Sequence, residues 1–246
     1  MSGSEATDSR NESVVLYGIE DRPPLGEAIP LGIQHVLAMF LGNVAPPLIL
    51  AGAVGSVTGE TTFLVQMALI VAGVATLVQA FPIGPVGARL PIVMGTSFAF
   101  LGPLIGIGSE FGLAAVFGTA LLAAPVEMVM GVTLDRFRRY FPPLVTGIVV
   151  MLIGLTLMPT GMDYAAGASA GPGAEGYGSF LNLGLAGLVL LTTLILNQFF
   201  EGFLRVISVF VGIALGYLVA IALGVVDFSG VATAGWITVP VPLKYG

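Results

Sequence analysis

The sequence predicts an all-α integral membrane protein, and three observations carry that prediction. Hydrophobic residues make up 56% of the 246 residues, and charged residues only 9%. The mean hydropathy is +1.01, whereas a soluble domain carries about a quarter charged residues. Between residues 29 and 224 the apolar runs are interrupted at lengths that fit one bilayer crossing each, because a helix needs roughly 20 apolar residues to span a hydrocarbon layer of about 30 Å.

Seven candidate spans follow one another along the chain. They cover 29–51, 62–81, 90–107, 111–131, 142–160, 179–198 and 203–224. Residues 1–28 form a polar tail without the pattern of a secretory signal peptide, so the first span is expected to be retained. Residues 225–246 are weakly apolar and punctuated by proline. They read as a connector on the outer side, and we expect the chain to be part of a longer protein truncated before an eighth span.

The cysteine and charge content exclude some functions and predict the orientation of the protein in the membrane. The sequence has no cysteine, so disulfides and thiolate metal sites are excluded. It also has no stripe of basic residues of the kind that binds nucleic acid. With a cytoplasmic N-terminus, the inner segments hold seven of the eight basic residues and the outer segments only Lys244, a strong positive-inside bias. We expect a cell-membrane protein whose C-terminus, in this chain, lies outside. The same bias disfavours pairing with an inverted copy of the chain.

The first span carries polar residues inside an apolar run. Gln34 and His35, the only histidine, are followed by Gly42 on the same helix face, about two turns further on. Because polar side chains in hydrocarbon must find partners, this face should look into the bundle. His35 could equally tie two helices together. Pro46 and Pro47 remove backbone donors and are expected to loosen the helix beyond them.

The third span is a poor continuous helix. Its glycines and proline are Gly95, Gly102, Pro103, Gly106 and Gly108. Thr96–Phe100 has the character of a strand. An interrupted helix at mid-membrane is tolerated only where its backbone is buried in protein or lines a cavity, and such helices recur at the substrate sites of secondary transporters. The plainer alternative is that the small residues serve helix packing alone.

Glu127 is the only acid inside a predicted span. A carboxylate at the bilayer centre costs roughly 2.5–3.5 kcal/mol on insertion scales. Glu127 is therefore either a proton-handling or gating residue, or a side chain that reaches the cytoplasmic interface one turn away.

Two stretches resemble a known family. QHVLAMFLGNVAPPLIL (34–50) resembles the first-helix signature of the nucleobase–ascorbate transporters, also called uracil–xanthine permeases. LPIVMGTSFAF (90–100) resembles that family's third segment. The resemblance implies one inverted repeat of seven segments, from a fourteen-segment core and gate transporter. Residues 29–131 would be half of the core and 142–224 half of the gate, with a short strand at Thr96–Phe100 in the broken third segment.

The resemblance also implies a substrate site. Phe98 would offer its backbone amide and ring to a nucleobase, and Ser97 would lie beside it. Gly42 would line the pocket from the first segment. Thr96 and Ala99 flank the motif, while Gln34 and His35 match a Gln-His pair that tunes binding. The family's principal substrate-binding acids belong to segments eight and ten, which these residues do not include.

The function implied is symport of nucleobases with a cation, H⁺ in preference to Na⁺. The double proline and the GTSF form of the third segment favour purines such as xanthine or urate over uracil. No metal or organic cofactor is expected, and the partners are the nucleobase, the lipid bilayer and a second copy held through the gate. An enzyme is disfavoured because one histidine leaves little for acid–base chemistry. The alternatives left open are an anion transporter of the sulfate-exchanger type and a membrane subunit or truncated product that does not transport.

Overall fold

The computed structural model describes residues 17–18, 21–56, 58–137, 140–167, 176–233, 241 and 244–245. The longer helices are α1 (Leu25–Ala53), α2 (Thr58–Ala80), α3 (Leu101–Phe137), α4 (Pro143–Ala166), α5 (Phe180–Phe199) and α7 (Ser208–Ala222). The short elements are the 3₁₀ turn η1 (Phe98–Phe100), α6 (Phe203–Val206) and α8 (Ser229–Thr233). Outside the described residues lie most of the predicted polar tail, Arg138 and Arg139, most of the loop after α4, and much of the outer connector.

Among the described residues, five helices are long and apolar enough to cross a membrane, and α7 is a shorter apolar helix of 15 residues. This agrees with a multi-pass membrane protein. The predicted count of seven segments is not confirmed. Helix α3 joins two helices across a kink at Gly112, close to the boundary predicted between the third and fourth spans. The seventh span is divided into α6 and α7 by a break at Ile207.

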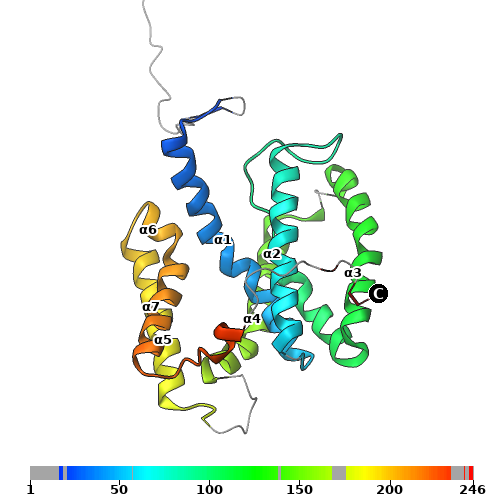
Figure 1. Ribbon diagram of the computed structural model, residues 1–246. Helices are drawn as coiled ribbons and strands as arrows, with labels where there is room; N and C mark the ends of the chain where they lie inside the picture. The colour runs from blue at the N-terminus through cyan, green and yellow to red at the C-terminus, as the bar shows by residue number, and fades with distance from the viewer. Residues whose placement is uncertain are drawn as a thin grey trace, which may run out of the picture.

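Helix α3 has two arms that meet at Gly112. This residue has φ 79° and ψ 179°, a conformation that side chains disfavour and glycine allows. Figure 1 shows the bend, with one arm of α3 along the edge of the molecule. The boundary predicted between the third and fourth spans therefore lies close to the kink that separates the two helical arms of α3.

The helices form two groups. Helix α1 packs against α2 and α3, and α5 packs against α4, α6 and α7, while α1 also touches α6 and α7 (Figure 1). Tyr164 of α4 links the groups, because its hydroxyl donates to the carbonyl oxygen of Leu48 in α1 at 3.1 Å. The division falls where the sequence divides 29–131 from 142–224, and the roles of core and gate stay predictions.

Small residues let α5 and α7 approach closely. Ser208, Gly212 and Gly216 recur every four residues on α7 and all three are buried. A Cβ on Gly212 would lie 2.4 Å from the Thr193 hydroxyl oxygen and 3.0 Å from the Val189 carbonyl oxygen on α5. This is the small-residue spacing by which membrane helices pack without a hydrophobic driving force.

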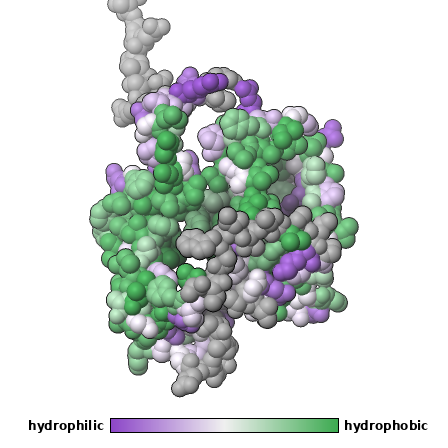
Figure 2. Space-filling view, in the orientation of Figure 1, coloured by the Kyte–Doolittle hydropathy of each residue, from purple (hydrophilic) through white to green (hydrophobic). Residues whose placement is uncertain are grey.

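The buried core is small and most of the surface is apolar. Leu50, Leu101 and Val116 form a cluster where α1 meets both arms of α3. Figure 2 shows hydrophobic residues over most of the visible face, with hydrophilic ones along its upper edge. A surface of this kind suits contact with lipid or with other apolar protein.

Candidate functional site

Residues 91–97, here called the extended segment, have no regular secondary structure and lead into η1 and then α3. The prediction that the third span is interrupted is confirmed. The short strand predicted at Thr96–Phe100 is not confirmed, because Phe98–Phe100 forms a 3₁₀ turn. A strand needs a neighbouring strand for its ladder, and in the described part of the chain the extended segment instead pairs with side chains.

Asn43 holds the extended segment against α1 and α2. Its side chain is 1% exposed. The Oδ1 atom accepts the backbone N–H of Thr96 at 2.8 Å, and Nδ2 donates to the carbonyl oxygen of Ala68 in α2 at 3.3 Å. An amide buried at membrane depth must satisfy both its donor and its acceptor, and Asn43 does so by joining three parts of the chain.

Thr76 of α2 provides a second attachment. Its hydroxyl donates to the carbonyl oxygen of Ala72 at 2.7 Å and accepts the backbone N–H of Met94 at 2.9 Å. Two amides of the extended segment, two residues apart, are therefore paired with side chains from different helices.

The prolines of α1 explain the position of Thr96. Pro46 and Pro47 have no N–H, so the carbonyl oxygens of Gly42 and Asn43, four residues earlier, lose their helical donors. The Thr96 hydroxyl lies 3.3 Å from the first of these oxygens and 3.1 Å from the second. The hydroxyl can donate to one of these two oxygens at a time, and α1 continues to Ala53. The loosening expected beyond the prolines is not confirmed.

Several amides at the site have no partner among the described residues, and that of Phe98 is the one at the start of η1. Ser97 caps η1, since its hydroxyl oxygen accepts the N–H of Ala99 at 3.3 Å. For the N–H of Phe98, the described residues provide no hydrogen-bond acceptor. It lies where η1 and α3 begin, at the end of a helix that carries partial positive charge. An acceptor such as a ring carbonyl oxygen would be favoured there.

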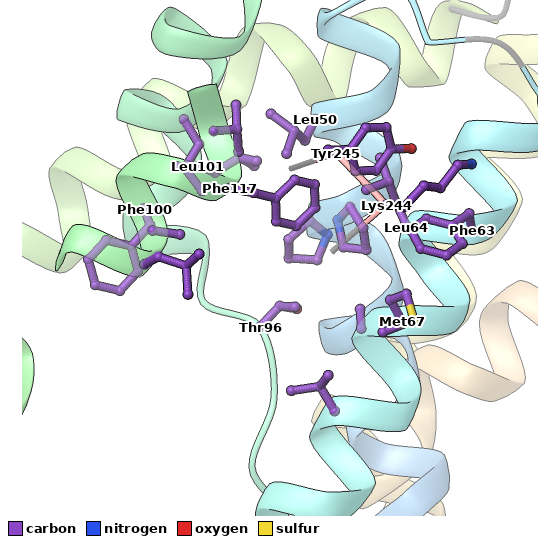
Figure 3. A pocket seen from close by; sticks show the side chains of 18 of the residues that line it. Leu50, Phe63, Leu64, Met67, Thr96, Phe100, Leu101, Phe117, Lys244 and Tyr245 are labelled. Atoms are coloured by element: carbon purple, nitrogen blue, oxygen red, sulfur yellow. The ribbon is translucent and has the colours of Figure 1, made fainter. Parts of the chain in front are cut away.

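A first cavity, of about 490 Å³, lies on one side of the extended segment and includes Thr96 and Ser97 in its lining (Figure 3). Apart from these two and Lys244, its walls are formed mainly by apolar residues of α1, α2 and α3. Tyr245 occupies part of it. Its ring is nearly parallel to Phe117, with centroids 5.3 Å apart, and meets Phe63 edge-on at 5.9 Å.

The Tyr245 hydroxyl is buried, and no described residue bonds to it. Burial raises the pKa of Tyr245, so this hydroxyl stays neutral. Lys244 lies alongside, with its ammonium 4.4 Å from the centre of the Phe63 ring. The first cavity therefore holds an aromatic ring of this chain between Phe117 and Phe63.

A second cavity, of about 210 Å³, lies between η1 and α4. Phe98, Ala99, Gly102 and Pro103 form one wall. The other wall is one face of α4, made by Val149, Leu152, Ile153, Thr156 and Leu157. The predicted site residues are thus divided, with Thr96 and Ser97 on the first cavity and Phe98 and Ala99 on the second.

The remaining predicted residues lie further away. Gly42 touches the site through its carbonyl oxygen, which accepts from Thr96. Gln34 is half-buried and His35 exposed, about two turns before Gly42 on α1, and neither lines a cavity described above. Glu127 is exposed on the second arm of α3 and lines neither cavity.

Sequence reasoning gave no role to Asn43, Thr76 or Thr156. A signal existed for Asn43, because an amide inside an apolar span must find partners. The two threonines had no such signal, since threonine in a membrane helix commonly bonds to its own backbone.

Comparison with known proteins matches residues 26–246 to the sequence profile of a permease family. The uric acid permease PucK of Bacillus subtilis is 39% identical over 216 residues, which are 88% of this chain and 50% of that protein. The xanthine permease of the same organism is 37% identical, covering 92% of this chain and 51% of that protein. Xanthine permease XanP of Escherichia coli is 39% identical, covering 95% and 53%. The chain spans about half the length of the curated relatives it matches.

Proposed function

Because this chain belongs to the nucleobase–ascorbate transporter family of permeases, we propose that it forms part of a carrier that moves nucleobases across the cell membrane. The unpaired amide of Phe98, presented by a broken helix, is the observation that supports the proposal most directly. Broken helices with free backbone groups are how secondary transporters bind substrate near the midplane. In this proposal the chain corresponds to the first of two inverted repeats.

The site suits a flat heterocycle that carries carbonyl groups. The Phe98 amide would donate to a ring carbonyl oxygen, and the Phe98 ring would offer a face for stacking. Asn43 and Thr76 hold the extended segment, so the amide is positioned before substrate arrives and less ordering entropy is lost on binding.

We propose a purine substrate of the xanthine or urate type in preference to uracil. The relatives named above as xanthine and uric acid permeases support this preference. The GTSF sequence at 95–98 supports it as well. Its first three residues lie in the extended segment, and its fourth, Phe98, begins η1.

We further propose that transport is coupled to H⁺ in preference to Na⁺. The N-terminus is cytoplasmic, and the protein forms a homodimer through α4, α5 and α7. The arginine distribution supports the orientation. Because the chain has no cysteine of its own, labelling by a membrane-impermeant maleimide tests it. Glu60→Cys should react from outside and Arg136→Cys should not. The reverse pattern would overturn the orientation.

The central test is uptake of radiolabelled xanthine, uric acid and uracil by cells that produce the complete gene product. We expect accumulation of the purines, abolished by a protonophore and unaffected by replacing Na⁺ with choline. Phe98→Ala should reduce uptake. Phe111→Ala, at an exposed position of α3 that lines neither cavity, should not. No uptake of any nucleobase above that of cells without the gene would refute the proposal.

A further inference from the structure

Thr156 stands out on the wall of the second cavity that faces Phe98. Nine residues line this cavity, and Thr156 is the only one on α4 with a polar side chain. The α4 lining residues 149, 152, 153, 156 and 157 are spaced as one helix face. A lone hydroxyl on that face is unexplained by packing, because valine would fill the same volume without a polar atom.

The hydrogen-bonding state of Thr156 defines what it can recognise. Its hydroxyl donates to the carbonyl oxygen of Leu152 at 2.7 Å. A hydroxyl has one hydrogen and two lone pairs, so with its hydrogen committed to the backbone Thr156 acts toward the cavity as an acceptor. Its exposed side chain is accessible to a ligand there.

The opposite wall has the complementary group. Phe98 brings an N–H that has no acceptor among the described residues. Phe98 and Thr156 therefore line opposite walls of the second cavity, one with an unpaired N–H and the other with a hydroxyl. Oxopurines alternate carbonyl and N–H groups around their edge, so one flat ring can accept from the first wall and donate to the second.

We propose that Thr156 is a substrate-contacting, specificity-determining residue that accepts a ring N–H of the nucleobase from the α4 side. This rests on the proposed transport function. It places one half of the recognition on the α1–α3 group of helices and the other on the α4–α7 group. Substrate would then bridge the two groups, and a shift of α4 away from η1 would separate donor from acceptor.

The test compares Thr156→Val with Thr156→Ser in the complete gene product. Valine keeps the volume and removes the acceptor, so KM for xanthine should rise about two- to tenfold, the range of one neutral hydrogen bond. Serine keeps the hydroxyl and should restore KM. Thr133→Val is the matched control, because Thr133 makes the same bond to Val129 at 2.7 Å but lines neither cavity.

Methylated ligands give a readout that a structural role would not move. In competition assays, the wild type should reject the N-methylxanthine whose methyl group replaces the hydrogen facing α4. Thr156→Val should lose that discrimination while keeping the others. An unchanged KM and an unchanged methylxanthine profile in Thr156→Val would overturn the proposal.

A labelling experiment decides the matter if the valine variant is poorly produced. Xanthine should slow modification of Thr156→Cys by a thiol reagent and leave that of Thr133→Cys unchanged. If the wild type transports xanthine but xanthine does not protect Thr156→Cys, the role of Thr156 is refuted and the proposed function stands. If the wild type itself transports no nucleobase, the proposed function fails first and this inference fails with it.

Discussion

Replacing Asn43 by alanine tests whether the extended segment is held in place by side chains of α1 and α2. The change removes the acceptor for the Thr96 N–H at 2.8 Å and the donor to Ala68 at 3.3 Å. The first bond is the shorter and we assign it most of the effect. The side chain is almost fully buried, so water does not easily replace either partner.

The magnitude follows from the group left without a partner. A donor that loses its acceptor costs about 1–3 kcal/mol when buried, and the Thr96–Asn43 bond is part-buried, so the lower part of this range applies. Polar bonds between membrane helices average about 0.6 and reach about 1.7 kcal/mol. A value of about 1–1.7 kcal/mol satisfies both ranges. At about 1.4 kcal/mol for each factor of ten, the held conformation should become roughly 5- to 20-fold less favoured against released ones.

The assay is the KM for xanthine uptake together with thermal unfolding of the purified complete gene product. KM should rise by up to the same factor, because binding is weakened by the fraction of molecules still competent. Asn182→Ala is the control. It removes bonds to the carbonyl oxygens of Ala166 and Gly176 at 3.1 and 3.0 Å, far along the chain from the extended segment. It should lower stability and leave KM unchanged. A KM for Asn43→Ala within twofold of the wild type, at normal stability, would show that Asn43 does not hold the extended segment in place.

Three further predictions concern packing and titration. Gly212→Ala should force α5 and α7 apart and lower the unfolding free energy by about 1–3 kcal/mol, whereas Gly187→Ala, with open space at its Cβ, should not; equal thermal midpoints would contradict this. Tyr245→Phe removes a buried hydroxyl that no described residue bonds, so the midpoint should stay equal or rise, and a fall would reveal a partner. The N–H and hydroxyl of Ser229 hold the pKa of Asp227 below its usual range. The stabilisation of the fold by these two hydrogen bonds is therefore present at neutral pH and is lost as acid protonates the carboxylate. Amide chemical shifts of Ser229 followed by NMR should move only below the ordinary titration range of aspartate, and movement within that range would contradict the assignment.

The break in the third span was predicted from its glycines and proline, but only Gly95 of these lies in the extended segment, whereas Gly102, Pro103, Gly106 and Gly108 lie within α3. The strand expected there depended on a neighbour, and the sequence of one segment says nothing about what lies beside it. The bond between Asn43 and Thr96 joins residues 53 positions apart, a separation that no helical or strand period indicates. The count of seven spans is not confirmed, although the kink at Gly112 lies close to the boundary predicted between the third and fourth spans.

The hydroxyl of Thr96 faces two carbonyl oxygens at nearly equal range, 3.3 and 3.1 Å, and has one hydrogen to give. Rotation about a single side-chain bond transfers that hydrogen from one acceptor to its neighbour. When the extended segment shifts slightly along α1, the Thr96 hydroxyl can therefore exchange one carbonyl oxygen for the other. The number of hydrogen bonds stays the same. The adjacent prolines make this exchange possible, because each leaves one carbonyl oxygen on the same turn of α1 without its helical donor.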